Sequence, residues 1–190
     1  MIITKILAAI TVIFLMGGVC AAQALPDLET MKKKYPGDKA VILNDQEDVL
    51  IEVEGDSYKI TESIIKETYL LQNTGTAFAT DKVYSSHFYK IKEIDAKTLV
   101  PDGKKFIAKK VEKFVDSKSQ PDYVFYDEIV TKSFVFPAIQ PGVITSLKYV
   151  QELNNPLMLG AFFFKWRIPC EISRIVWSCR LLENMMVFPS

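Results

Sequence analysis

The segment from Tyr123 to Tyr149 constrains the fold more than any other part of this chain. It is rich in aromatic and β-branched residues, which favour strands with a half-buried face. The sequence Gln140-Pro141-Gly142 interrupts it, and a central strand does not run through a Pro-Gly pair, because proline has no amide hydrogen for the ladder. The segment therefore predicts core strands that meet at a fixed turn.

Two other regions show the two-residue period of a strand. The first runs from Lys82 to Ile91, where His87 shares a face with every second residue. The second runs from Gly160 to Ile168, and its aromatic residues at positions 162, 164 and 166 should share a buried face. Each region predicts one continuous strand.

Turn sequences separate these regions, and no stretch between them shows a convincing helical period. Strands separated by turns about every ten residues are typical of a sandwich rather than an α/β fold. We predict an all-β, antiparallel β-sandwich over residues 40–190 and a solvated linker over residues 25–39. The predicted turns lie at 44–48, 54–56, 73–75, 101–104, 117–122 and 154–156.

The first 24 residues predict a signal peptide. Lys5 is their only charged residue, an apolar run follows it, and Ala22-Gln23-Ala24 matches a small-x-small cleavage site. Two alternatives are a retained membrane anchor, because apolar character persists to Ala22, and a lipoprotein that uses Cys20. We predict cleavage after Ala24 and export to the periplasm or the extracellular space.

The charge balance gives no reason to expect a nucleic-acid partner. The chain has 23 basic and 23 acidic residues, and removal of Lys5 with the signal leaves a net charge of about −1. We therefore predict no binding to nucleic acid and membrane contact only through the signal segment.

The sequence offers no credible catalytic triad. His87 is the single histidine, and no Gly-x-Ser-x-Gly motif accompanies it. The closeness of Ser85 and Ser86 in the sequence does not make either a nucleophile for His87, because adjacent strand residues point to opposite faces. We predict that His87 has no catalytic role and that the chain is not an enzyme.

Cys170 and Cys179 remain once the signal segment is removed. On one extended strand they would lie about 30 Å apart, far beyond disulfide reach, and no turn sequence separates them. Because export permits disulfides, a bond between them stays open. Two cysteines and one histidine do not complete a four-ligand zinc site, so we predict no metal and no cofactor.

Acidic and aromatic residues leave two alternative functions open. Paired acids would support glycoside hydrolysis if two carboxyl groups met in a cleft at about 5 to 9 Å. Exposed aromatic side chains would support carbohydrate binding. The candidate acids are Glu47-Asp48, Glu93 with Asp95, and Asp127-Glu128, and the candidate platform is Tyr84, Phe88, Tyr123 and Tyr126.

A series of short motifs carries a family resemblance. In order, they are Tyr35-Pro36 with Ala40-Val-Ile-Leu43, Pro101-Asp-Gly-Lys104, Phe134-Val-Phe-Pro137 with Pro141-Gly-Val-Ile144, and Phe164-Lys-Trp166-Arg-Ile-Pro169 with Ser173-Arg174. Over residues 35–174 the chain resembles a bacterial domain of unknown function. That domain is found N-terminal to transglutaminase-like domains in exported proteins, chiefly of the Bacteroidetes type.

The resemblance implies a β-sandwich with no catalytic residues of its own. In the family a transglutaminase-like or peptidase-like domain with a Cys-His-Asp triad normally follows. Neither Cys170 nor Cys179 is expected to be that catalytic cysteine, because both lie inside or just after the sandwich.

The composition changes after Arg174, where Trp, Cys and Met become frequent. This change indicates a truncated or frameshifted reading of a longer gene from about residue 175. The leading hypothesis is a non-catalytic exported accessory module that, in a longer parent, positions or shields a transglutaminase-like domain or binds an envelope polymer. The sequence leaves the partner, the ligand and the oligomeric state open.

Overall fold

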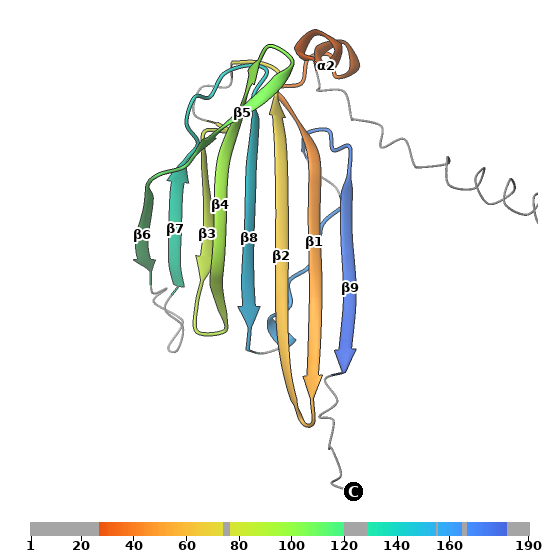
Figure 1. Ribbon diagram of the computed structural model, residues 1–190, viewed down its shortest axis with the longest axis vertical. Coiled ribbons are helices and arrows are strands. Elements are labelled where there is room, and N and C mark those ends of the chain that lie inside the picture. The colour runs from red at the N-terminus through yellow and green to blue at the C-terminus, as the bar shows by residue number, and fades with distance from the viewer. Residues whose placement is uncertain (1–26, 74–76, 120–128, 155, 165–166, 182–190) are drawn as a thin grey trace, which may run out of the picture.

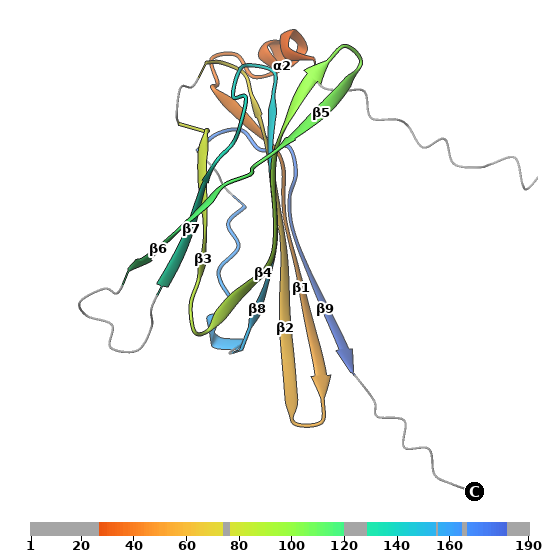
Figure 2. The ribbon, with the colours of Figure 1, turned by 60° about the vertical axis from the view of Figure 1, so that its left-hand side comes forward.

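Two β-sheets make up the computed structural model, which describes residues 27–73, 77–119, 129–154, 156–164 and 167–181. The six-stranded sheet has the order β5-β4-β8-β2-β1-β9, and the three-stranded sheet has the order β3-β7-β6. Figure 1 shows the large sheet face-on, and Figure 2 shows the small sheet as a second layer. The predicted all-β fold is confirmed.

The strands of the large sheet are β1 (Ala40–Glu54), β2 (Ser57–Leu70), β4 (Tyr89–Asp102), β5 (Lys105–Lys110), β8 (Ile144–Leu153) and β9 (Ser173–Leu181). The strands of the small sheet are β3 (Thr80–Ser85), β6 (Phe114–Ser119) and β7 (Ile129–Val135). A short helix, α2 (Leu28–Lys34), and one 3-10 turn, η1 (Pro156–Met158), complete the described elements. The helices among the described residues are all too short, or too polar, to span a membrane.

The core between the two sheets is largely aromatic and aliphatic. Val83, Phe134 and Phe136 from the small-sheet side pack against Ala96 and Leu147 of the large sheet. The rings of Phe134 and Phe136 lie 5.3 Å apart in an edge-to-face arrangement, which aromatic pairs prefer. Burial of this apolar surface holds the two layers together.

The chain passes between the sheets at four places. One of them, from β2 to β3, contains the predicted turn at 73–75, part of which lies outside the described residues. The sequence predicted only one of the other three. The corner around Gly142 separates β7 from β8, as expected for strands that meet at a fixed turn. The predicted strand from Lys82 to Ile91 is instead broken at residues 86–88, where the amide of Ser86 donates to the carbonyl of Tyr89 over 2.8 Å. A third passage, at residues 111–113, joins β5 to β6. The sequence did not reveal these two breaks, because the two-residue strand period continues through both of them.

The predicted turn at residues 44–48 does not exist. β1 runs through this polar stretch and pairs antiparallel with β2 from Ala40 to Glu54, with one register shift between Ile42 and Asn44. The backbone there is paired on both sides, since β9 also lies beside β1 from Asp45 to Val53. Ladder hydrogen bonds therefore outweigh the turn preference of these polar side chains. β6 likewise extends to Ser119, into the predicted loop at 117–122.

One pairing departs from an antiparallel sandwich. β9 runs parallel to β1, and in Figure 1 β1, β8 and β9 all point downward. The connection from Leu153 to Ser173 must therefore return along the sheet before β9 begins, because parallel strands need a crossover.

The predicted strand from Gly160 to Ile168 is wrong. Its described residues form no strand, and Phe164, which was expected on the buried face, is 62% exposed. Trp166 lies outside the described residues. Residues 160–168 belong to the connection from β8 to β9, and alternation produces a strand only where a neighbouring strand supplies backbone partners.

The predicted linker is also partly wrong, because α2 occupies residues 28–34. Asp27 caps the helix by accepting a hydrogen bond from the Thr30 amide over 3.1 Å, and three lysines occupy the last turn. Met31 is only 6% exposed and packs in a cluster with Val41 and Tyr69. One buried methionine in a polar segment was too weak a signal to reveal this docking.

The docking of α2 can be tested with Met31→Ala. Loss of this buried side chain should lower the free energy of unfolding by about 2 to 3 kcal/mol, because the helix presents Met31 to the core. The control Lys32→Ala, on the exposed face, should change it by less than about 0.5 kcal/mol. Urea denaturation followed by circular dichroism measures both. Equal effects of the two substitutions would contradict a docked helix.

The corner can be tested with Gly142→Ala. Gly142 has φ of +90°, and its amide donates to the Leu70 carbonyl over 2.8 Å, so the backbone cannot relax freely. Alanine should cost about 1 to 2 kcal/mol through left-handed strain. Gly160→Ala is the control, because Gly160 does not have a left-handed φ and an added Cβ meets nothing within 4 Å. If both variants melt like the parent, the corner does not constrain the fold.

Candidate functional site

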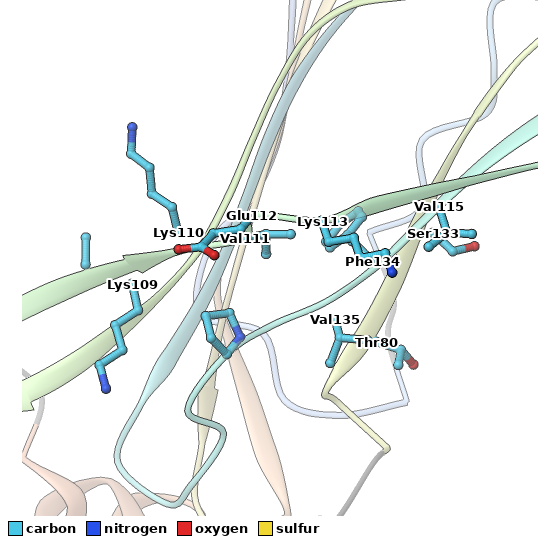
Figure 3. Close-up of a pocket in the computed structure, with 12 residues that line it drawn as sticks. Thr80, Lys109, Lys110, Val111, Glu112, Lys113, Val115, Ser133, Phe134 and Val135 are labelled. Carbon is cyan, nitrogen blue, oxygen red and sulfur yellow. The ribbon is translucent and has the colours of Figure 1, made fainter.

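A groove opens where the chain passes from β5 to β6, next to the outer strands of the small sheet. Its volume is about 920 Å³. Figure 3 shows Lys109 and Lys110 extending to opposite sides of the β5 end, with Val135 and Thr80 on the other wall. The lining residues are Thr80, Ala108, Lys109, Lys110, Val111, Glu112, Lys113, Val115, Ser133, Phe134, Val135 and Pro137.

The groove has apolar walls and a basic rim. Val115 and Val135 are 53% and 60% exposed, although valine side chains of a folded domain are usually buried. Among the charged side chains of the lining, three are lysines and one is Glu112. Such a surface suits an elongated partner that combines apolar groups with negative charge.

The groove lining does not include the residues of a Ser-His or Cys-His nucleophile pair. Its lining contains neither histidine nor cysteine, and Ser133 therefore has no base beside it. His87 lies elsewhere, exposed in the 86–88 passage, with its ring packed edge-on against Phe88 and its carbonyl accepting a hydrogen bond from Asn154. The hydroxyl of Ser86 accepts from the Phe88 amide.

The predicted aromatic platform is only partly described. Tyr84 is exposed on β3, and the ammonium group of Lys82 lies 5.2 Å from the centre of its ring. Phe88 is half-buried in the 86–88 passage, after the turn that ends β3. Tyr123 and Tyr126 lie outside the described residues. The platform therefore stays a prediction.

Cys170 and Cys179 are both free thiols. The backbone of Cys170 forms an isolated β-bridge with that of Ile42, and Cys179 on β9 lies opposite Ile51 on β1. These two positions on β1 are nine residues apart. That separation is about 30 Å in an extended strand, so no disulfide joins them. The Cys170 thiol donates to the Ile172 carbonyl over 3.3 Å, and burial raises its pKa, which makes it a poor nucleophile.

The structure describes two of the three predicted acid pairs, Glu47-Asp48 on β1 and Glu93 with Asp95 on β4. Glu47 and Asp48 are neighbours on β1 and so point to opposite faces, and Asp95 forms an ion pair with Lys97 at 2.6 Å. Asp127 and Glu128 lie outside the described residues. Likewise, no group of three His, Cys, Asp or Glu residues in the described part of the chain could hold a metal ion.

The structure instead brings Glu47 together with Glu62, a pair that the sequence analysis missed. Glu62 lies opposite Val49 on the paired strands, two positions from Glu47, so both carboxyl groups point to the same face of the large sheet. They line one pocket of about 200 Å³. The sequence does show that Asp45, Glu47 and Val49 alternate and so share one face of a strand. It does not show which strand pairs with that one, and therefore it could not reveal that Glu62 lies beside them.

Burial controls the acidity of this pair. Glu62 is 4% exposed, and desolvation raises its pKa although Gln151 donates a hydrogen bond to its Oε2. The pKa of Glu47 is raised by desolvation and then by the negative charges of Glu62 and Asp45. Burial also raises the pKa of Tyr149, which lines the same pocket, to about 12.

These shifts predict the pH dependence of stability. A folded-state pKa above the ordinary 4.5 means that the folded chain holds protons more tightly, so Glu62 reduces stability as pH rises from 4.5 towards neutrality. Glu62→Gln removes this penalty, and its stability relative to the parent should increase over that range. Denaturation in urea at pH 4.5 and pH 7 measures the difference.

Glu152→Gln serves as the control with the opposite sign. Hydrogen bonds from Lys92 and Lys59 lower the pKa of Glu152, so its carboxylate adds stability above its ordinary pKa. That variant should lose stability relative to the parent as pH rises. The same pH trend in both variants would contradict the buried state of Glu62.

The chain matches the model of one known domain family. A family model, described as a domain of unknown function with a solved structure (DUF3857), matches residues 61–181. This match extends beyond Arg174, where the sequence resemblance had stopped, and therefore includes the whole of β9 with Cys179. No curated protein matches the chain.

Two solved structures illustrate the structural comparison. A crystal structure of a candidate protease from Parabacteroides distasonis aligns with a TM-score of 0.47 and 13% identity, covering 66% of this chain and 24% of that one. Leukotriene A4 hydrolase from Saccharomyces cerevisiae aligns with a TM-score of 0.27 and 12% identity, covering 64% of this chain and 18% of that one. The chain thus spans a quarter or less of these proteins.

Proposed function

The chain belongs to the DUF3857 family of domains of unknown function, and on that premise we propose that it is a non-catalytic binding module of an exported protein. The module holds a partner in the groove beside β5 and β6. In a longer parent, that partner is an extended acidic segment of a following transglutaminase-like domain, which the module positions or shields.

The observation that carries this proposal is the groove itself. Its exposed valines provide an apolar strip, and its three lysines provide positive charge next to that strip. Apolar contact with an extended chain supplies affinity, whereas the lysines select a negatively charged sequence. The lining offers no nucleophile and base pair, so the groove supports binding rather than chemistry.

The outer strands of the small sheet add a route for such binding. β3 and β6 each pair on one side only, with β7, among the described strands. An extended segment beside β6 would lie along the groove wall that Val115 contributes. Strand addition of this kind obtains affinity from main-chain hydrogen bonds and specificity from alternate side chains.

The two alternative functions have less support. A carbohydrate-binding face would rest on Tyr84, Phe88, Tyr123 and Tyr126, of which Tyr84 and Phe88 are separated by the turn at residues 86–88. Hydrolysis by paired carboxylates would require both acids to reach a substrate. Glu62 is only 4% exposed, which disfavours contact with the bulky rings of a polysaccharide.

A peptide titration tests the proposal. The full chain is titrated by calorimetry with a peptide that alternates glutamate and valine, and with a matched peptide in which lysine replaces glutamate. We expect binding of the acidic peptide only, with affinity that falls as salt is added. Val115→Asp should weaken binding at least about tenfold, because it places a charge in the apolar wall.

The matched control is Val176→Asp. Val176 is also an exposed valine, but it lies on β9 and does not line the groove. This variant should bind like the parent. Equal binding of both peptides, or no effect of Val115→Asp, would refute the groove as the binding site. Binding of soluble peptidoglycan fragments alone would replace the peptide partner with an envelope polymer.

A further inference from the structure

A second, smaller pocket lies between the large sheet and the connection that follows β8. Four strands and the connection form it, so it exists only in the folded chain. Its volume is about 200 Å³, and it shares no residue with the groove. The lining consists of Glu47 from β1, Glu62 and Ile64 from β2, Tyr89 from β4, Tyr149 and Gln151 from β8, and Gly160.

Glu62 presents an unused hydrogen-bond acceptor in this pocket. Its side chain is more than nine-tenths buried, Gln151 donates to Oε2, and Oε1 is buried with no hydrogen-bond partner. A buried acceptor without a donor destabilises the folded chain, and more so if it is charged. A bound N–H donor would remove that penalty, so the oxygen points to a ligand rather than to a structural role.

The two carboxyl groups of the lining favour a positively charged ligand. Glu47 and Glu62 occupy diagonal positions on paired strands, which places them about 7 to 8 Å apart at the backbone, and both side chains line the pocket. Asp45 lies on the same face, next along β1. On this face of β2, Lys66 lies opposite Asp45 and lines a different cavity, beside Thr68.

The remaining walls favour an organic cation over a metal ion. Ile64 provides apolar surface, and the rings of Tyr89 and Tyr149 provide faces that attract an ammonium group. The described residues contain no group of three metal-ligating side chains, so a divalent ion would lack ligands here. A small pocket with one apolar wall and two carboxyl groups matches an alkyl stem that ends in an amine.

We propose that this pocket binds a primary alkylammonium group. The ammonium donates to Oε1 of Glu62 and is balanced by the charge of Glu47, while the alkyl stem lies against Ile64 and the tyrosine rings. The same chemistry is offered by a lysine side chain of a polypeptide and by a free aliphatic amine. The proposal is independent of the groove, because the two sites have no lining residue in common.

The test uses the full chain and three small probes. n-Butylammonium chloride represents a free amine, Nα-acetyl-lysine methylamide represents a polypeptide lysine, and 1-butanol is the uncharged analogue. Chemical-shift perturbation in nuclear magnetic resonance spectra measures binding. We expect at least one amine to bind with shifts at Tyr89 and Tyr149, and 1-butanol to bind at least about tenfold more weakly, since charge-assisted hydrogen bonds contribute about 1.5 to 3 kcal/mol.

Variants distinguish the pocket from general attraction to a charged surface. Glu62→Gln and Glu47→Gln should each weaken amine binding about tenfold or more. Glu93→Gln removes the same charge from an exposed position on β4 that is not in the pocket lining, and it should bind like the parent. Folding of each variant is checked by its melting curve.

Each outcome decides the proposal. Selective binding of the lysine derivative would identify a polypeptide ligand, and selective binding of n-butylammonium would identify a free amine. Binding of neither amine, equal binding of 1-butanol, or equal losses in Glu62→Gln and Glu93→Gln would overturn the site. Acidic-peptide binding in the groove should persist in Glu62→Gln, so failure of one proposal leaves the other testable.

Discussion

Backbone pairing between β1 and β2 is the constraint on which the rest of the structure depends. These long strands form a hairpin at the centre of the large sheet, and their register determines which side chains share a face. Through that register Glu47 and Glu62 enter the same pocket, although fourteen residues separate them along the chain. β9 and β8 then pair with the two outer sides of the hairpin, and α2 packs near the end where Val41 and Tyr69 meet.

The passages between the sheets create the surfaces on which function is proposed. The passage at residues 111–113 leaves Val115 and Val135 uncovered beside three lysines, and so forms the groove. The connection from β8 to β9 places Gly160 against the acidic pocket. Both sites therefore arise at irregular segments held by a rigid sheet framework, which is where binding sites commonly lie.

The acidic pocket shows how burial turns ordinary side chains into a specific site. On an exposed strand, Glu62 would be one more solvated carboxyl group. Enclosed beside Gln151, Tyr149 and Ile64, it has a raised pKa and an acceptor oxygen without a partner. The folded chain carries this unfavourable arrangement because the surrounding apolar core supplies the opposing free energy.

The sequence by itself determined the all-β class, the corner at Gly142 and the reversal at Gly103, because strand period and turn chemistry act over a few neighbouring residues. It did not predict that residues 86–88 and 111–113 are passages between sheets, since alternation is the same whichever sheet a strand joins. It also predicted a strand at 160–168 and a linker over residues 25–39 that in fact contains α2, because pairing and docking partners were decisive there. Only the tertiary structure brought Glu47 to Glu62 and left Val115 exposed, because contact and burial depend on segments far apart in the chain.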